Sequence, residues 1–149
     1  MLKTPASIAG EHRELHETLG RAANEPGELG VAARALEKVL GPHFKREEEI
    51  ATPPLGLLGP LAQGHATPEM RAVLPMTRAL ERELPQMLRE HENIRKALAR
   101  FRAAAKRANR QDYVSFADGL AAHARQEEEI LYPAAVIVGR YVALMTREP

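Results

Sequence analysis

The sequence carries one pattern twice, HFKREEEIATP at residues 43–53 and HARQEEEILYP at residues 123–133. The two stretches share a histidine, three consecutive glutamates, an isoleucine and a proline at an offset of 80 residues (123 − 43). A shorter pair, EHREL at 11–15 and EHENI at 90–94, precedes them at an offset of 79 residues (91 − 12). Each half of the chain therefore reads EH and then HxxxEEEIxxP. This pattern indicates a duplicated helical hairpin rather than a solenoid, which needs three or more repeats.

Good helix formers fill the chain between a few turn signals. Alanine, leucine, glutamate and arginine dominate long stretches that lack the alternation typical of strands. Turn residues gather at 24–27, in a Gly- and Pro-rich connection at 55–68, and at 109–112. Four helices are predicted, over residues 5–23, 28–51, from residue 69 or 76 to 108, and 113–145. The predicted fold class is all-α: an up-down antiparallel four-helix bundle with an internal pseudo-twofold repeat, in a single domain over residues 1–149.

Charged and imidazole side chains occupy positions where a bundle helix needs apolar ones. Steps of four and three residues mark the expected core stripe of each helix. Histidines or glutamates fall on this stripe in all four helices, at His12, His43, Glu47, His91, His123 and Glu127. In the fourth helix the same stripe continues through Ile130, Ala134 and Ile137. A buried carboxylate without a partner is costly, so the two glutamates are expected to face cations.

The spacing of these residues favours a pair of metal ions. Residues four apart share one helix face, which pairs His12 with His16, His43 with Glu47, and His123 with Glu127. Five histidines and two carboxylates exceed the needs of one tetrahedral zinc. They suit two six-coordinate ions bridged by the carboxylates, with iron favoured over manganese or zinc. The Glu-x-x-His signature of ferritin-type di-iron bundles is absent, since none of the histidines has a glutamate three residues before it.

With these motifs the chain resembles the hemerythrin-like, HHE-type cation-binding domain, from about Ile8 to Tyr141. The resemblance implies an up-down bundle that holds a non-haem di-iron centre. It also implies terminal histidine ligands and bridging carboxylates, carried over as His12, His43, His91 and His123, and as Glu47 and Glu127. The oxygen carriers of that family place a second HxxxH pair on the third helix, where this chain has Arg95. Here the pair is His12 and His16 on the first helix, so His16 is a candidate fifth histidine ligand.

Several residues also have plainer interpretations. His16 alone has the alternative of a hydrogen-bonded core histidine. His65 lies in the Gly- and Pro-rich connection and is expected to be exposed. Tyr132 is expected to pack in the core, with contact to the metal pocket as the alternative. The remaining glutamates of the two runs are expected to form ordinary solvated helix faces: Glu48, Glu49, Glu128 and Glu129.

Composition narrows the classes of function. The 149 residues include no cysteine, which excludes disulfides, thiolate metal sites and a cysteine nucleophile. A net charge of +1 and only 4% aromatic residues argue against nucleic-acid binding. No apolar run marks a signal peptide or a membrane span, so a cytoplasmic location is expected.

Three functions stay open at this point. The leading one is a di-iron protein that binds dioxygen or a related small molecule for carriage, storage or sensing. The second is a di-iron enzyme that acts on peroxide, ferrous iron or nitrosative damage. The third is a bundle with purely structural metal that binds a partner through a helix face. The ligand types are common to the first two functions, so the question of enzymatic activity is left undecided.

Overall fold

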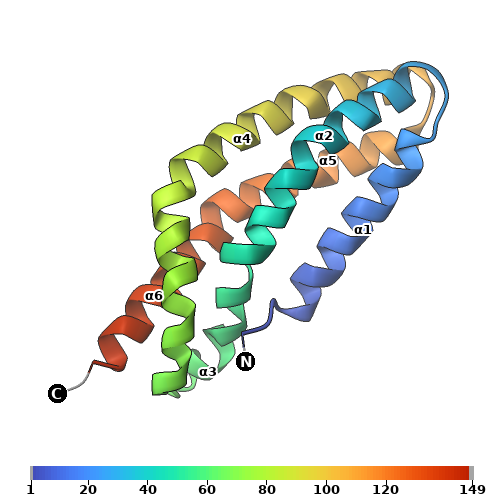
Figure 1. Cartoon of the computed structure of the whole chain (residues 1–149). Coiled ribbons are helices and arrows are strands. Elements are labelled where there is room, and N and C mark those ends of the chain that lie inside the picture. Colours follow the sequence, from blue (N-terminus) through green and yellow to red (C-terminus); the bar gives the residue numbers. More distant parts are fainter. Residues whose placement is uncertain (1, 148–149) are drawn as a thin grey trace.

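The computed structural model describes residues 2–147, which form helices and connections without a strand. Three long helices are α1 (Ala6–Ala23), α2 (Gly27–Ile50) and α4 (Leu74–Arg107). The fourth helical run consists of α5 (Gln111–Gln126), a π-helical segment η3 (Glu127–Leu131) and α6 (Tyr132–Met145). These four runs pack antiparallel, with neighbouring helices side by side along the bundle (Figure 1). The predicted all-α antiparallel bundle is confirmed.

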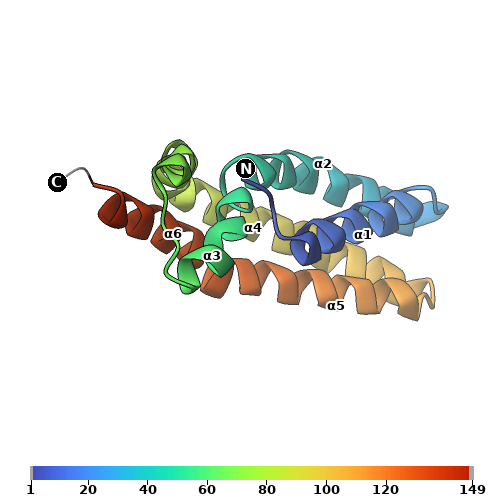
Figure 2. The same cartoon turned by 90° about the horizontal axis from the view of Figure 1, so that it is seen from below.

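The two ends of the bundle are closed differently. At one end, short turns join α1 to α2 and α4 to α5. In the second turn Asn109 adopts a positive φ of 55°, and the Arg110 N–H donates to the Ala105 carbonyl at 2.9 Å, which ends α4 in a left-handed cap. At the other end, η1 (Pro53–Leu57), α3 (Leu58–Ala62) and η2 (Pro68–Val73) form the connection from α2 to α4 (Figure 2).

Two prolines lie inside long helices without ending them. Pro42 lies within α2 one residue before His43, and the helix continues to Ile50. Pro85 lies within α4, which bends along its length (Figure 1). A proline inside a helix lacks the N–H for the bond to the preceding turn, so a bend is the expected response. Both helices therefore stay continuous past the positions where their histidines lie.

A polar layer separates two apolar clusters of the core, and a further cluster packs α6 against the α2–α4 connection. One cluster lies toward the short turns and includes Leu36, Leu98 and Leu120. The other lies toward the α2–α4 connection and includes Ile50 and Met87. In sequence, the buried histidines and glutamates of α2, α4 and α5–η3 fall between these clusters. The polar layer is thus buried in the bundle, with apolar side chains packed on either side of it.

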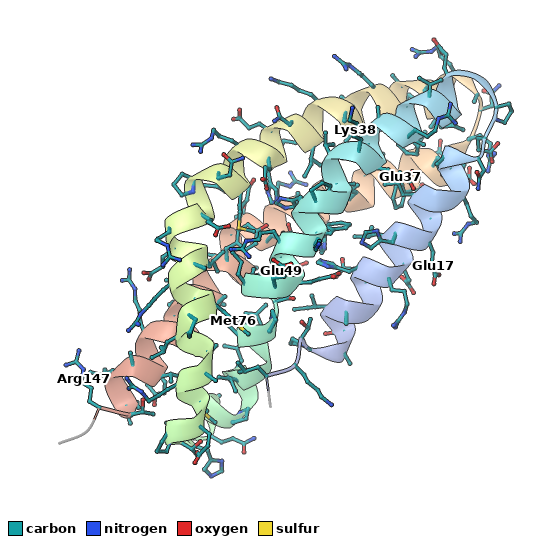
Figure 3. The ribbon with its side chains drawn as sticks, viewed as in Figure 1. Glu17, Glu37, Lys38, Glu49, Met76 and Arg147 are labelled. Atoms are coloured by element: carbon teal, nitrogen blue, oxygen red, sulfur yellow. The ribbon has the colours of Figure 1, made fainter. Side chains whose placement is uncertain are left out.

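Charged side chains lie on the outer faces of α1 and α2. Glu17 and Lys38 are exposed and point away from α1 and α2 (Figure 3). Within residues 2–147, no helix combines the length and the apolar character that crossing a membrane requires.

The core stripe predicted for the fourth helix is wrong beyond Glu127. Ile130 and Ile137 are exposed and Ala134 is only half-buried. The N–H of Tyr132 bonds to the Glu127 carbonyl five residues earlier, the pattern of a π-turn. This wider turn adds one residue to the register, so Tyr132 and the residues that follow it at helical spacing, Ala135, Val138 and Val142, are the buried ones.

Candidate metal centre

Six of the seven predicted site residues meet in the middle of the bundle, and all six are buried. They come from four helical runs: His12 from α1, His43 and Glu47 from α2, His91 from α4, and His123 and Glu127 from α5 and η3. Their nitrogen and oxygen atoms form two neighbouring groups that meet the spacing of metal ligands.

The first group is built around His43 and His91. Their Nε2 atoms lie 2.9 Å apart. Oε1 of Glu47 lies 3.0 Å from Nε2 of His43, one helical turn away on α2. Oε2 of Glu127 lies 3.1 Å from Nε2 of His91. Two imidazole nitrogens and two carboxylate oxygens thus converge from α2, α4 and η3.

The second group is built around His12 and His123, whose Nε2 atoms lie 3.2 Å apart. Oε1 of Glu127 lies 3.6 Å from Nε2 of His12 and also contacts Nε2 of His123. Oε2 of Glu47 is 3.8 Å from Nε2 of His12. His12, His123 and Glu127 together meet the spacing of metal ligands, and the remaining oxygen of Glu47 faces this group on the side of His12.

Each glutamate therefore directs one oxygen toward each pair of histidines, which is the arrangement of a bridging carboxylate. Oε2 of Glu47 and Oε1 of Glu127 are buried and have no hydrogen-bond partner among the described residues. A buried carboxylate oxygen without a donor is unfavourable unless a cation compensates it. The residues present thus fit a pair of cations, the first between His43 and His91 and the second between His12 and His123.

Tyr132 contributes a further oxygen to the first group. Its hydroxyl lies 3.3 Å from Nε2 of His43 and 3.2 Å from Nε2 of His91, and it donates to Oε1 of Glu47. Tyr132 is buried in the core as predicted, and its hydroxyl also contacts the candidate ligands. The residue at the same repeat position is Thr52 (132 − 80). The hydroxyl of Thr52 bonds to that of Thr4 at 2.9 Å, so the second group has no such oxygen from this position.

Four outer carboxylates face the other nitrogen, Nδ1, of each buried histidine. Glu90 lies 2.7 Å from Nδ1 of His43, and Glu128 lies 2.8 Å from Nδ1 of His91. Glu11 lies 2.9 Å from Nδ1 of His123, and Glu48 lies 3.6 Å from Nδ1 of His12. A carboxylate at Nδ1 orients the ring and leaves Nε2 to bind a metal.

These outer carboxylates change two interpretations made from the sequence. The solvated-face interpretation is wrong for Glu128, which is half-buried and also binds Arg95 at 2.5 Å. Glu48 is exposed but faces His12. Glu49 and Glu129 are exposed as predicted.

No role is predicted from the sequence for Glu11 and Glu90, although both belong to the EH pairs at 11–12 and 90–91. The signal was present in the repeat. Each half places one glutamate directly before a buried histidine and another directly after a buried glutamate. Adjacent residues on a helix point in different directions, so the outer glutamate of each pair contacts a histidine of a neighbouring helix.

The buried ionisable groups carry strongly shifted pKa values. Burial opposes the charge on His43, but the hydrogen bond to Glu47 and the charge of that carboxylate outweigh it and raise the pKa of His43 to about 9. The pKa of His123 is likewise raised to about 9 against the effect of burial, through Glu127. Burial raises the pKa of Glu47. Without a metal, the imidazoles of His43 and His123 therefore hold protons at neutral pH, and metal binding must displace them.

The structure does not bring the seventh predicted residue, His16, into either group. His16 is exposed, and its ring meets that of Phe44 edge-on, with the ring centroids 4.9 Å apart. Arg95 stands at the corresponding position of the other half (16 + 79), where it binds the outer carboxylate Glu128. His65 is exposed, as predicted.

Comparison with known proteins agrees with this geometry. Residues 5–135 match the family model described as the hemerythrin HHE cation binding domain. The match spans the four helical runs as far as the beginning of α6 and includes both groups of candidate ligands. Comparisons with curated proteins and with solved structures found no match.

Proposed function

The chain belongs to the hemerythrin HHE cation-binding family, and we propose that its buried centre holds two iron ions and binds dioxygen or a related small molecule for carriage, storage or sensing. One observation carries this proposal. Glu47 and Glu127 each direct one oxygen toward His43 and His91. The other oxygen of Glu127 faces both His12 and His123, and the other oxygen of Glu47 faces His12. A single cation would use only half of this arrangement, whereas two cations use all of it.

The donor set favours iron. Imidazole and carboxylate ligands without any thiolate suit iron, and manganese or zinc less well at this number of donors. When bound, a pair of iron ions supplies redox chemistry and coordination positions for a small ligand. The protein holds the pair in place, since carboxylates at Nδ1 orient the imidazoles of His43, His91 and His123.

We place the small ligand at the metal between His12 and His123. The first group offers five donor atoms, because the Tyr132 oxygen joins two imidazoles and two carboxylate oxygens. The second group offers three donors at ligand spacing, two imidazoles and one oxygen of Glu127, and Oε2 of Glu47 lies 3.8 Å from Nε2 of His12. An ion that prefers six ligands has more room for an exogenous molecule where the protein supplies fewer. The contact of Tyr132 with only the first group thus supports different roles for the two metals, although similar pairs of histidines would hold them.

Metal analysis and spectroscopy together test this function. Protein produced with ample iron is expected to contain about two iron ions per chain. After anaerobic reduction, exposure to oxygen is expected to produce a visible absorption band that disappears when oxygen is removed. A chain that takes up one zinc ion and no iron would overturn the di-iron proposal. Two iron ions without any reaction with oxygen would leave the metal a structural role.

Enzymatic activity toward peroxide is the second candidate, and the Tyr132 hydroxyl favours it. This O–H group lies within 3.3 Å of ligand atoms of both His43 and Glu127, where it can donate a hydrogen bond to a peroxide oxygen. Burial and the two carboxylates raise the pKa of Tyr132, so the hydroxyl keeps its proton. To separate this candidate from reversible binding, hydrogen peroxide is added to the reduced and to the oxidised iron forms of the protein. The loss of peroxide is then followed over time. An enzyme consumes peroxide over many turnovers, whereas a carrier or sensor does not.

A further inference from the structure

The outward side of α6 carries an apolar surface that no part of the described chain covers. Ile137, Tyr141 and Leu144 follow one another at steps of four and three residues, and Met145 lies beside them. Ile137 is 63% exposed and Leu144 is 59% exposed. Leu58 of α3 borders the same surface, because it lines a hollow of about 340 Å³ together with Ile137 and Tyr141. We call these five residues the α6 face.

The π-turn explains why these residues face outward. It shifts the register after Glu127 by one residue, which turns Ile130 and Ile137 away from the core. Ile130 is 56% exposed and stands one heptad before Ile137. The apolar repeat Ile130, Ile137 and Leu144 therefore runs along the outside of the helix, with the spacing of a helix that packs on another helix.

We propose that the α6 face is the interface of a homodimer, in which α6 of one chain packs antiparallel against α6 of a second copy. This inference is independent of the metal centre and of its function. It rests on the area, the register and the charge of the face.

The area is sufficient for a dimer. The five residues of the α6 face and Ile130 together expose on the order of 600 Å² per chain, so that two copies would bury roughly 1,200 Å², the lower end of the range for stable interfaces. An exposed apolar patch of this size is at the upper end of the range for monomeric proteins, about 300–600 Å², where such patches often mark a contact site. Val31 and Leu88, the other large apolar side chains exposed among residues 2–147, lie on different helices.

The register of the face suits a second copy of the same chain. Ile130 and Leu144 lie seven residues before and seven residues after Ile137. If a twofold axis passes beside Ile137, Leu144 of one chain therefore lies opposite Ile130 of the other. The hollow between α3 and α6 offers room for an apolar side chain from the partner. Most symmetric oligomers are dimers of this self-complementary kind.

Charge does not oppose the pairing. Arg140, the only charged residue within α6, binds Glu81 of α4 in its own chain at 2.8 Å. The apolar residues of the α6 face therefore border a neutral pair rather than an unbalanced cation.

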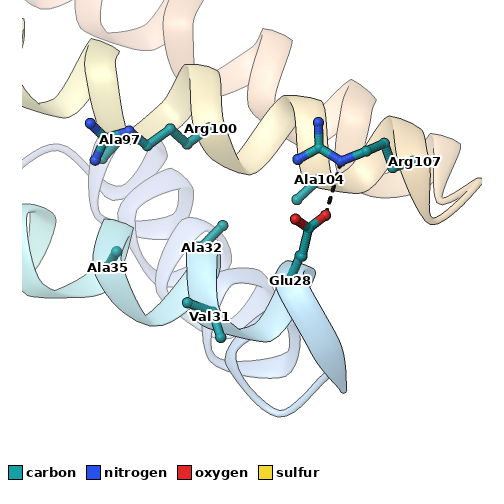
Figure 4. Close-up of a pocket in the computed structure, with 8 residues that line it drawn as sticks. All are labelled: Glu28, Val31, Ala32, Ala35, Ala97, Arg100, Ala104 and Arg107. Atoms are coloured by element: carbon teal, nitrogen blue, oxygen red, sulfur yellow. Dashed lines mark hydrogen bonds and ion pairs between the residues drawn. The ribbon is translucent and has the colours of Figure 1, made fainter.

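A second hollow lies between α2 and α4, and charged side chains border it, unlike the hollow between α3 and α6. Its lining includes Val31 and Ala32, but guanidinium groups of Arg100 and Arg107 lie at its edge, and Arg107 bridges it by binding Glu28 at 2.9 Å (Figure 4). Val31 is 61% exposed, as much as Ile137, and lies at the other end of the bundle. It therefore provides a matched control for substitutions in the α6 face.

Sedimentation equilibrium of the full chain, in its metal-loaded form, tests the proposal. The wild type is expected to approach twice the chain mass of 16.5 kDa, with a dissociation constant on the order of micromolar. Ile137→Glu and Leu144→Glu are expected to raise that constant at least about thirtyfold, since each buries a charge in the interface. Val31→Glu is expected to leave it unchanged, and all three variants should keep the wild-type helix content because these positions are exposed.

A second measurement tests the register. The chain has no cysteine, so a single introduced thiol can form a disulfide only with another copy. Ile137→Cys, close to the twofold axis, is expected to give a covalent dimer under mild oxidation, whereas Val31→Cys is not. The proposal is overturned if the wild type keeps the mass of one chain up to about 500 µM. It is also overturned if Val31→Glu, and not the α6 variants, dissociates the dimer, or if the monomer binds phosphatidylcholine vesicles through this face.

Discussion

Nδ1 of His43 lies 2.7 Å from Oε2 of Glu90, although Glu90 is the direct neighbour of His91 in sequence. Two adjacent residues of α4 thus serve the same metal position in different ways. His91 directs Nε2 toward the candidate cation, and Glu90 orients the facing histidine of α2. Glu127 and Glu128 divide their roles in a similar way, since Glu127 lies between the metal positions and Glu128 binds Nδ1 of His91. The EH and EE pairs of the repeat therefore contain both a candidate ligand and the residue that orients another ligand.

The outer carboxylates are expected to strengthen metal binding. Glu90→Gln and Glu128→Gln should each weaken metal affinity ten- to a hundredfold, about the range found when an orienting partner is lost. Glu48→Gln should have a smaller effect, because Glu48 lies 3.6 Å from His12 and is exposed. Competition with a chelator measures these affinities. Exposed Glu129, next to Glu128, provides the control as Glu129→Gln, and equal effects at positions 128 and 129 would contradict this role.

The bridging carboxylates are expected to be essential for both metals. Glu47→Gln or Glu127→Gln removes one negative charge from between two cations, so that their repulsion is less well compensated. Metal content should fall from about two ions per chain to well below one. Glu49→Gln, an exposed position on the same helix as Glu47, should keep the wild-type content. Retention of two ions by either bridging variant would show that its carboxylate does not bridge.

Tyr132 is expected to distinguish the two metal positions. Tyr132→Phe removes only the hydroxyl oxygen near His43 and His91, so the iron content should stay near that of the wild type. The visible spectrum should change, and titration with azide should show a second binding event that the wild type lacks. Tyr113→Phe, a buried position in the apolar cluster near the short turns, is the control. A single azide per chain with an unchanged spectrum would exclude this role for Tyr132.

The stability of the metal-free protein is expected to fall as the pH rises, whereas the affinity for metal is expected to rise. The pKa values of His43 and His123 are raised from 6.5 to about 9 in the metal-free fold. Their contribution to stability is fully present below pH 6.5 and is lost as the pH rises through 9. The Tm of metal-free protein should therefore fall by at least several degrees over this interval.

Metal affinity changes in the other direction, because fewer protons must be displaced at higher pH. The difference in Tm between metal-loaded and metal-free protein should widen from pH 6 to pH 9 and shrink in acid. Calorimetry of both forms across this range measures it. A difference that does not vary with pH would mean that these histidines are not ligands.

His16 is expected to be dispensable for the centre. The side chain is exposed and lies outside both groups of candidate ligands, so His16→Ala should keep the iron content and the visible spectrum of the wild type. His12→Ala, one helical turn earlier on α1, removes a buried candidate ligand and should lower metal content. Loss of iron in His16→Ala would restore the five-histidine interpretation of the sequence.

The sequence alone determined the bundle and the six central residues. Both depend on properties that are local to a helix: a four-and-three periodicity defines its buried stripe, and a spacing of four places His43 and Glu47 on one face. The repeat then brings four such stripes together. This reasoning holds as long as each helix is regular.

Only the tertiary structure decided what lies around these six residues. The π-turn at Glu127–Leu131 is a change in backbone hydrogen bonding that composition does not reveal, and it turns Tyr132 inward and Ile137 outward. The contact between Glu90 and His43 joins two helices, so it depends on how their surfaces pack rather than on the spacing within either. His16 shares the spacing of a ligand pair with His12, yet it lies beyond the edge of the buried stripe. Periodicity specifies the centre of a buried face more sharply than its border, because one residue turns a helix by about 100°.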